Sequence, residues 1–127
     1  MVRAVCVGLA GFYAYGALVH VLNMASLTGF FWPEAPRKWQ GLDIAYLALD
    51  LVVVIGLIRG SRLGITAFFC AALSQIALYT LGRDWVLDVP EAFQRSAGDL
   101  AYLDGLVLFH LLSCLAMGGA LWRHRRA

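Results

Sequence analysis

Four apolar segments dominate the chain, and each is close to the length that a helix needs to cross a lipid bilayer. They cover residues 4–29, 42–58, 63–81 and 100–122. A hydrocarbon core about 30 Å thick is crossed by roughly 20 mostly apolar helical residues. Only 14% of the residues are charged, whereas a soluble domain carries about 25%. The sequence therefore predicts an all-α integral membrane protein with four transmembrane helices.

The connections between these segments predict how the helices follow one another. The second connection, RGSR, is so short that the flanking helices must form a tight antiparallel hairpin. In the third connection, Asp88 is followed three residues later by Glu91, which is the spacing of a capping box. This spacing predicts that the fourth helix begins near Pro90 as an interfacial stretch. We expect a single domain over residues 1–127, a four-helix antiparallel bundle with helices at about 4–29, 42–58, 63–81 and 90–122.

Charge is divided unequally between the two ends of this bundle. One end combines the N-terminus, the second connection and the C-terminus, and its arginines are accompanied by no acidic residue: Arg3, Arg59, Arg62, Arg123, Arg125 and Arg126. The opposite end mixes Arg37, Lys38, Arg83 and Arg95 with the acidic residues Glu34, Asp43, Asp84, Asp88, Glu91 and Asp99. Basic residues collect in the short cytoplasmic loops of membrane proteins. The sequence therefore predicts a multi-pass protein of the cell (inner) membrane, with both termini in the cytoplasm.

Several function classes find no support in the sequence. Cys6, Cys70 and Cys114 are isolated, so no disulfide framework or CxxC centre is expected. His124 lies in the arginine-rich tail, without the further ligands that a zinc site requires. The net charge of +2 includes no basic face of the nucleic-acid-binding kind. There is no P-loop, GxGxxG or Ser-His-Asp signature, so no motif predicts an enzymatic activity for the chain on its own.

Polar residues inside the predicted membrane spans recur on single helix faces. On the first helix, Gly16, His20 and Asn23 share one face, and Gly16 leaves room beside the imidazole. His20 lies about 16 residues and His110 about 12 residues from the cytoplasmic end of their helices, a difference of roughly 6 Å at about 1.5 Å per residue. We therefore expect a mid-membrane polar layer. Its members are His20, Asp50, Gln75 and His110.

Four interpretations of this polar layer remain open. It can hold the helices together through hydrogen bonds between them. His20 and His110 can be the axial ligands of a b-type haem. A quinone or lipid pocket between the helices would be lined by His20, Asn23, Asp50, Gln75 and Tyr79. Proton relay or transport is the fourth interpretation, although the broken helices and internal repeats of transporters are absent.

The segment LALDLVVVIGLIRGSRLGITAFFCAALSQIALY, residues 47–79, resembles the middle of DoxX-like small membrane proteins. The shared features are an acidic or polar residue entering the second helix, a glycine shortly before a short basic turn, and a third helix rich in small residues. The resemblance implies a four-helix bundle with an accessory role near quinone-linked redox enzymes, and it identifies no catalytic residue. His20 and Asn23 in the first helix depart from the family pattern.

The expected function follows from how little of the chain lies outside the membrane. We expect a small accessory or structural subunit of a larger membrane complex, of which a redox- or quinone-linked complex is one kind. Its expected partners are membrane lipids and other subunits or a second copy of the chain. No nucleic-acid partner is expected. The alternative is a bundle that binds haem b or a quinone or lipid through its layer of His, Asp and Gln side chains.

Overall fold

The computed structural model describes residues 1–126, and all regular secondary structure among them is helical. Four of the helices are long and apolar enough to cross a membrane, as predicted: α1 (Val2–Met24), α2 (Arg37–Ile58), α3 (Arg62–Tyr79) and α5 (Ala97–Arg126). Three short elements lie in the connections: η1 (Trp32–Glu34), α4 (Arg83–Leu87) and η2 (Glu91–Phe93). The chain is therefore an all-helical, multi-pass membrane protein.

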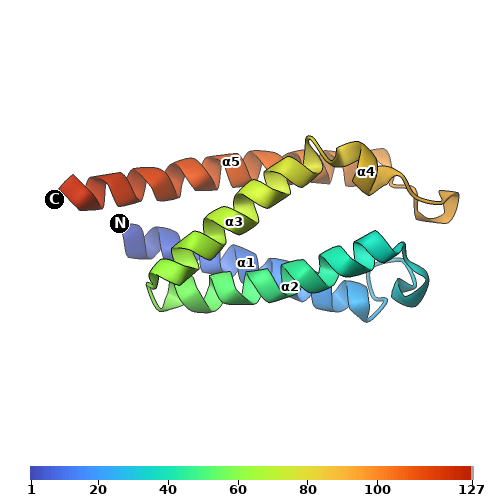
Figure 1. The fold of residues 1–127 in the computed structure, drawn as a ribbon, viewed down its shortest axis with the longest axis horizontal. Helices are drawn as coiled ribbons and strands as arrows, with labels where there is room; N and C mark the ends of the chain where they lie inside the picture. Colours follow the sequence, from blue (N-terminus) through green and yellow to red (C-terminus); the bar gives the residue numbers. More distant parts are fainter. Residues whose placement is uncertain (127) are drawn as a thin grey trace.

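Each of the four long helices packs against two others. α1 contacts α2 and α5, and α3 contacts α2 and α5. In Figure 1, α1 and α2 run alongside each other, while α3 crosses obliquely from the end of α2 toward the α4 region. Both termini lie at the same end of the molecule as the turn between α2 and α3 (Figure 1). We call this the terminal end, and the opposite end, which holds the other two connections, the loop end.

Two glycines allow the hairpin between α2 and α3 to close tightly. A Cβ atom on Gly56 would collide with the backbone of Gly64, and one on Gly64 with the backbone of Gly56. Gly60 makes the turn itself with a φ of 65°, which glycine adopts readily. Ser61 then caps α3, because its Oγ accepts a hydrogen bond from the Gly64 backbone N–H at 3.0 Å. The short connection thus produces the expected hairpin.

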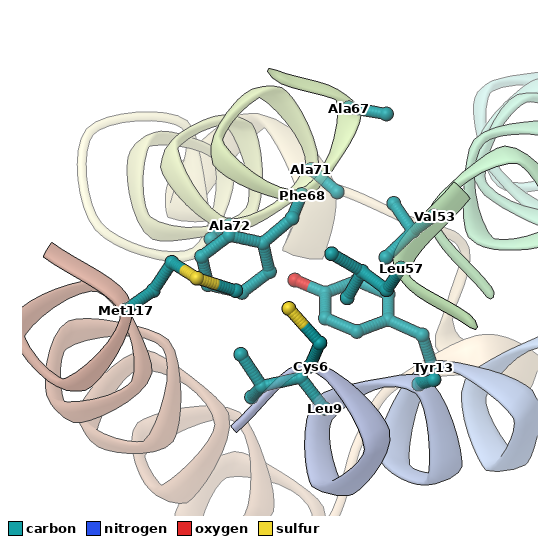
Figure 2. Packing of buried hydrophobic residues seen from close by; sticks show 11 residues of the cluster. Cys6, Leu9, Tyr13, Val53, Leu57, Ala67, Phe68, Ala71, Ala72 and Met117 are labelled. Carbon is teal, nitrogen blue, oxygen red and sulfur yellow. The ribbon is translucent and has the colours of Figure 1, made fainter. Parts of the chain in front are cut away.

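The apolar core lies between the four long helices in the half nearer the terminal end. Tyr13, Phe68, Leu57, Val53 and Met117 are its largest fully buried apolar side chains. Figure 2 shows Phe68 and Tyr13 at its centre, with the Met117 side chain extending toward Phe68 from α5. Close packing of this kind leaves few voids, so the core fixes how α1, α2, α3 and α5 sit around the rest of the interior.

The first two helices differ in their bounds from the sequence expectation. α1 ends at Met24 rather than residue 29, and the chain then turns, with Ser26 at a φ of 61° and Gly29 at 100°. α2 begins at Arg37 rather than residue 42, directly after Pro36. Hydropathy marks where a helix is apolar, whereas the polar first turn of α2 is helical without being apolar.

The predicted start of the last helix is wrong. Asp88 follows the end of α4, Glu91 lies in η2, and α5 begins only at Ala97. The capping box is formed instead by Ser96 and Asp99. Ser96 Oγ accepts from the Asp99 backbone N–H at 3.2 Å, and Asp99 Oδ2 accepts from the Ser96 backbone N–H at 3.0 Å.

Candidate functional site: a polar cavity between the helices

A cavity of about 290 Å³ opens between α1, α2, α3 and the first turns of α5, toward the loop end. All the residues predicted to form a pocket line it: His20, Asn23, Asp50, Gln75 and Tyr79. They come from three helices. His20 and Asn23 on α1, and Gln75 and Tyr79 on α3, are three and four residues apart, so each pair shares one face of its helix. Aromatic side chains make up much of the remaining wall, among them Phe12, Tyr13, Tyr15, Trp39, Tyr46 and Tyr102.

Asp43 organises one side of this cavity, although it is not among the site residues predicted from the sequence. Its carboxylate, on a residue only 6% exposed, accepts three hydrogen bonds. They come from His20 Nδ1 at 2.8 Å, Asn23 Nδ2 at 2.9 Å and Trp32 Nε1 at 2.9 Å. A carboxylate can only accept from these donors, so the proton of His20 lies on Nδ1. Asp43 therefore fixes both the orientation and the tautomer of the imidazole.

The second nitrogen of His20 faces Asp50. Its Nε2 lies 3.8 Å from Asp50 Oδ2, which is too far for a direct hydrogen bond. Asp50 is 2% exposed, and its Oδ1 has no hydrogen-bond partner among the described residues. Burying a polar group without a partner is costly. The buried carboxyl of Asp50, beside His20, therefore lacks a full set of hydrogen-bond partners among the described residues.

Gly16 creates room for the Asp50 carboxyl. A Cβ atom at position 16 would lie 2.8 Å from Asp50 Oδ2, closer than a van der Waals contact allows. The sequence predicts that Gly16 leaves room beside the imidazole, and in the structure the Asp50 carboxyl of the facing helix takes part of this room. Gly16 is thus a positioning residue for Asp50.

Tyr46 supports the imidazole and joins α2 to α3. Its ring stacks on that of His20, with centroids 6.2 Å apart and an interplanar angle of 15°. Its hydroxyl donates to Ser74 Oγ at 2.9 Å, and Ser74 Oγ donates to the Ala71 carbonyl at 3.0 Å. Two partners thus hold His20 in place, Asp43 through a hydrogen bond and Tyr46 through its ring face.

At the loop end, a cluster of aromatic side chains and one cation borders the cavity. The guanidinium of Arg95 lies over the ring of Trp39, 4.6 Å from its centroid, and 5.5 Å from that of Phe30, a cation–π arrangement. Trp39 Nε1 donates to the Val86 carbonyl at 2.9 Å. These contacts connect the α1–α2 connection to the segment between α3 and α5.

His110 does not join His20 at the cavity. It is fully buried, its Nδ1 donates to the Leu106 carbonyl at 2.6 Å, and its Nε2 has no partner among the described residues. Phe12 and Tyr13 pack edge-on against its ring. The single layer expected from helix depth therefore divides: His20, Asp50 and Gln75 line the cavity, while His110 lies within the packed interior. His110 is not among the residues that line the cavity, and haem ligation by His20 and His110 stays a prediction.

Comparison of this chain with protein-family models, curated proteins and solved structures finds no match. The resemblance of residues 47–79 to DoxX-like proteins therefore stays a prediction. Within residues 1–126, no group of three or more His, Cys, Asp or Glu side chains is arranged to hold a metal ion.

Proposed function

We propose that this protein binds the ring headgroup of a lipid-soluble compound of the quinone class in its polar cavity. The observation that carries the proposal is the buried carboxyl of Asp50. Its Oδ1 has no partner among the described residues, and Asp50 lines the cavity with its Oδ2 facing His20. Sites for small molecules in bundles lie between helices and combine an apolar wall with a few convergent polar groups. The cavity has this composition.

The size of the cavity favours a single ring over a larger cofactor. A volume of about 290 Å³ lies just below the usual range of small-molecule sites, which is about 300–1,000 Å³. Tyr13, Tyr15 and Tyr46 contribute ring surfaces to its wall, and aromatic rings pair favourably in stacked or edge-on arrangements. The isoprenoid tail of such a ligand would extend from the cavity into the lipid.

The polar groups favour the reduced, hydroxyl-bearing form of the ring. His20 Nδ1 donates to Asp43, so neutral His20 presents Nε2 as an acceptor. Asp50 Oδ2 faces Nε2 across the same space. A ring hydroxyl can donate to Nε2, whereas a quinone carbonyl has no proton to donate. Gln75 and Tyr79, from α3, add further hydrogen-bond donors to the wall of the cavity.

The proposal includes an antiparallel bundle in the cell (inner) membrane with both termini in the cytoplasm. It is supported by the six arginines of the terminal end, which come from the N-terminus, the α2–α3 turn and the C-terminus. The loop end carries charges of both signs, as translocated segments can. In this orientation the cavity opens toward the non-cytoplasmic half of the bilayer.

Binding of a hydroquinone to the purified full chain in lipid nanodiscs tests this function. Trimethylhydroquinone is the probe, and its dimethyl ether, which lacks donors, is the matched ligand control. We expect the hydroquinone to bind and the ether to bind much more weakly. Asp50→Asn and His20→Gln should each weaken hydroquinone binding about tenfold or more, since leaving a buried polar group of the ligand without its partner costs about 1–3 kcal/mol.

Asp104→Asn is the control variant, because Asp104 is exposed and pairs with Arg83 rather than lining the cavity. It should bind like the unaltered protein. The proposal fails if the unaltered protein does not bind the hydroquinone, or if Asp50→Asn and His20→Gln bind it as well as Asp104→Asn does.

An accessory role in a larger membrane complex, redox- or quinone-linked, is the second candidate, and one feature of α5 favours it. Among the four spanning helices, α5 buries the smallest share of its apolar span. Leu108, Leu112 and Leu115 are exposed on it. A photo-crosslinker in place of Leu115 should capture another membrane subunit or a second copy in native membranes. Recovery of the chain only as an uncrosslinked monomer would exclude this role.

A further inference from the structure

A second cavity, of about 530 Å³, opens at the terminal end, on the far side of the apolar core from the polar cavity. The first turns of α1, the end of α2, the turn at Gly60, the first turns of α3 and the last turns of α5 all contribute to its wall. It therefore lies where the N-terminus, the α2–α3 turn and the C-terminal helix come together (Figure 1). In a protein whose four long helices cross a bilayer, this end lies at the level of the lipid headgroups.

The rim of this cavity is basic and its floor is apolar. Arg3, Arg123 and His124 line it together with Met1, and none of its described lining residues is acidic. Within residues 1–126, neither arginine lies within ion-pair distance of a carboxylate. Leu57 and Cys6, both buried, form part of the floor. The cavity thus joins cationic groups to an apolar surface, as an anionic amphiphile requires.

We propose that this cavity binds an anionic phospholipid, with the phosphate between Arg3 and Arg123 and an acyl chain against the apolar floor. Guanidinium groups match phosphate oxygens in geometry and charge. The N-terminus of α1, a helix of 23 residues, places its unpaired backbone N–H groups and the positive end of its dipole at the same rim. Free phosphate would use the rim alone, so the buried floor favours a lipid.

This site is independent of the ring-binding cavity, with which it shares no lining residue. It also differs from general attraction between basic tails and anionic membranes, because its two arginines come from opposite ends of the chain and meet at one cavity. Arg125 and Arg126 belong to the same tail as Arg123 but do not line the cavity. Removing charge at the cavity and removing it elsewhere in the same region must therefore have different effects.

Titration of the detergent-solubilised full chain with phosphatidylglycerol, followed by native mass spectrometry, measures this binding. We expect one tightly bound phosphatidylglycerol per chain and at least tenfold weaker binding of phosphatidylcholine. The double variant Arg3→Gln/Arg123→Gln should lose about tenfold in affinity. The matched double variant Arg62→Gln/Arg125→Gln removes the same charge outside the cavity and should stay within about twofold of the unaltered protein.

Two further outcomes decide the source and the specificity of binding. Glycerol phosphate at millimolar concentration should not displace the lipid, and displacement would show a phosphate site without a lipid chain, which overturns the proposal. Equal losses in the two double variants, or equal binding of the two lipids, would reduce the effect to general charge attraction and overturn it as well. Circular dichroism of all variants confirms that each remains folded, so that a loss of binding reports on the site.

Discussion

Gly16 on α1 and Asp50 on α2 face each other so closely that a Cβ atom on Gly16 would lie 2.8 Å from Asp50 Oδ2. The substitution Gly16→Ala should therefore displace the Asp50 carboxyl from its place beside His20. We expect hydroquinone binding to weaken about tenfold, a loss of about 1.4 kcal/mol, while the helical content stays unchanged. Gly11→Ala is the control, since a Cβ atom there meets nothing within 4 Å. Equal binding by the two variants would contradict the positioning role of Gly16.

The close approach of Gly56 and Gly64 gives a prediction about stability rather than binding. Gly64→Ala places a methyl group against the backbone of α2, and overpacking of this kind costs about 1–3 kcal/mol. Thermal unfolding in detergent, followed by circular dichroism, should show a clear decrease in midpoint. Gly41→Ala, on the same hairpin but with open space around the new methyl group, should not decrease it. A Gly64→Ala protein as stable as Gly41→Ala would show that α2 and α3 do not pack this closely.

Asp43 and Asp50 should respond differently to the same substitution. Asp43 accepts from three donors, so Asp43→Asn places an amide NH₂ against at least one of them and should cost about 1–3 kcal/mol of folding free energy. Asp50 has an unpaired oxygen in the described structure, so Asp50→Asn should cost little stability while impairing ligand binding. Thermal unfolding and hydroquinone titration of both variants separate these effects. A larger stability loss for Asp50→Asn would reverse the assigned roles.

Hydropathy and helix periodicity were sufficient to predict the four spans and the group of residues at the polar cavity. His20, Asn23, Asp50, Gln75 and Tyr79 line it as expected, because polar side chains within apolar helices turn toward the interior of the protein. His110 did not join them. Hydropathy indicates how deep a residue lies in the membrane. It does not indicate whether the residue faces the apolar core or the polar cavity, because the walls of both are partly apolar.

Two other differences have local causes. Asp43 was grouped with the charges of the loop end because the second span was expected to begin at residue 42. In the structure α2 begins at Arg37 with a polar turn, so Asp43 lies inside the helix. The pairs Asp88–Glu91 and Ser96–Asp99 both have capping-box spacing, and the sequence alone does not choose between them. Tertiary contacts do: Lys38 Nζ donates to the backbone carbonyls of Trp85 and Asp88, which holds Asp88 at the end of α4.

The proposed orientation predicts opposite outcomes for reporters at the two ends of the molecule. A fluorescent protein that folds only in the cytoplasm, fused after residue 127 and expressed in a bacterial host, should fluoresce. Alkaline phosphatase, which is active only after export, should be inactive there and active when fused after residue 35. The arginines of the terminal end provide the physical reason, because basic residues resist translocation. Active phosphatase at the C-terminus would invert the topology and place the cavity mouth on the cytoplasmic side.

The start of α5 gives a final prediction that compares the two capping-box pairs directly. Ser96→Ala removes the hydroxyl that accepts from the Asp99 backbone N–H, and loss of an N-cap of this kind costs about 1 kcal/mol. We expect faster hydrogen exchange of the backbone amides of residues 97–100 and no change in the rest of α5. Asp88→Ala should leave these amides unaffected, because Asp88 lies at the end of α4. Faster exchange at residues 97–100 in Asp88→Ala but not in Ser96→Ala would instead support the sequence prediction of a helix that begins near Pro90. Because Arg95 and Asp99 line the polar cavity, such a continuous helix would also change its mouth.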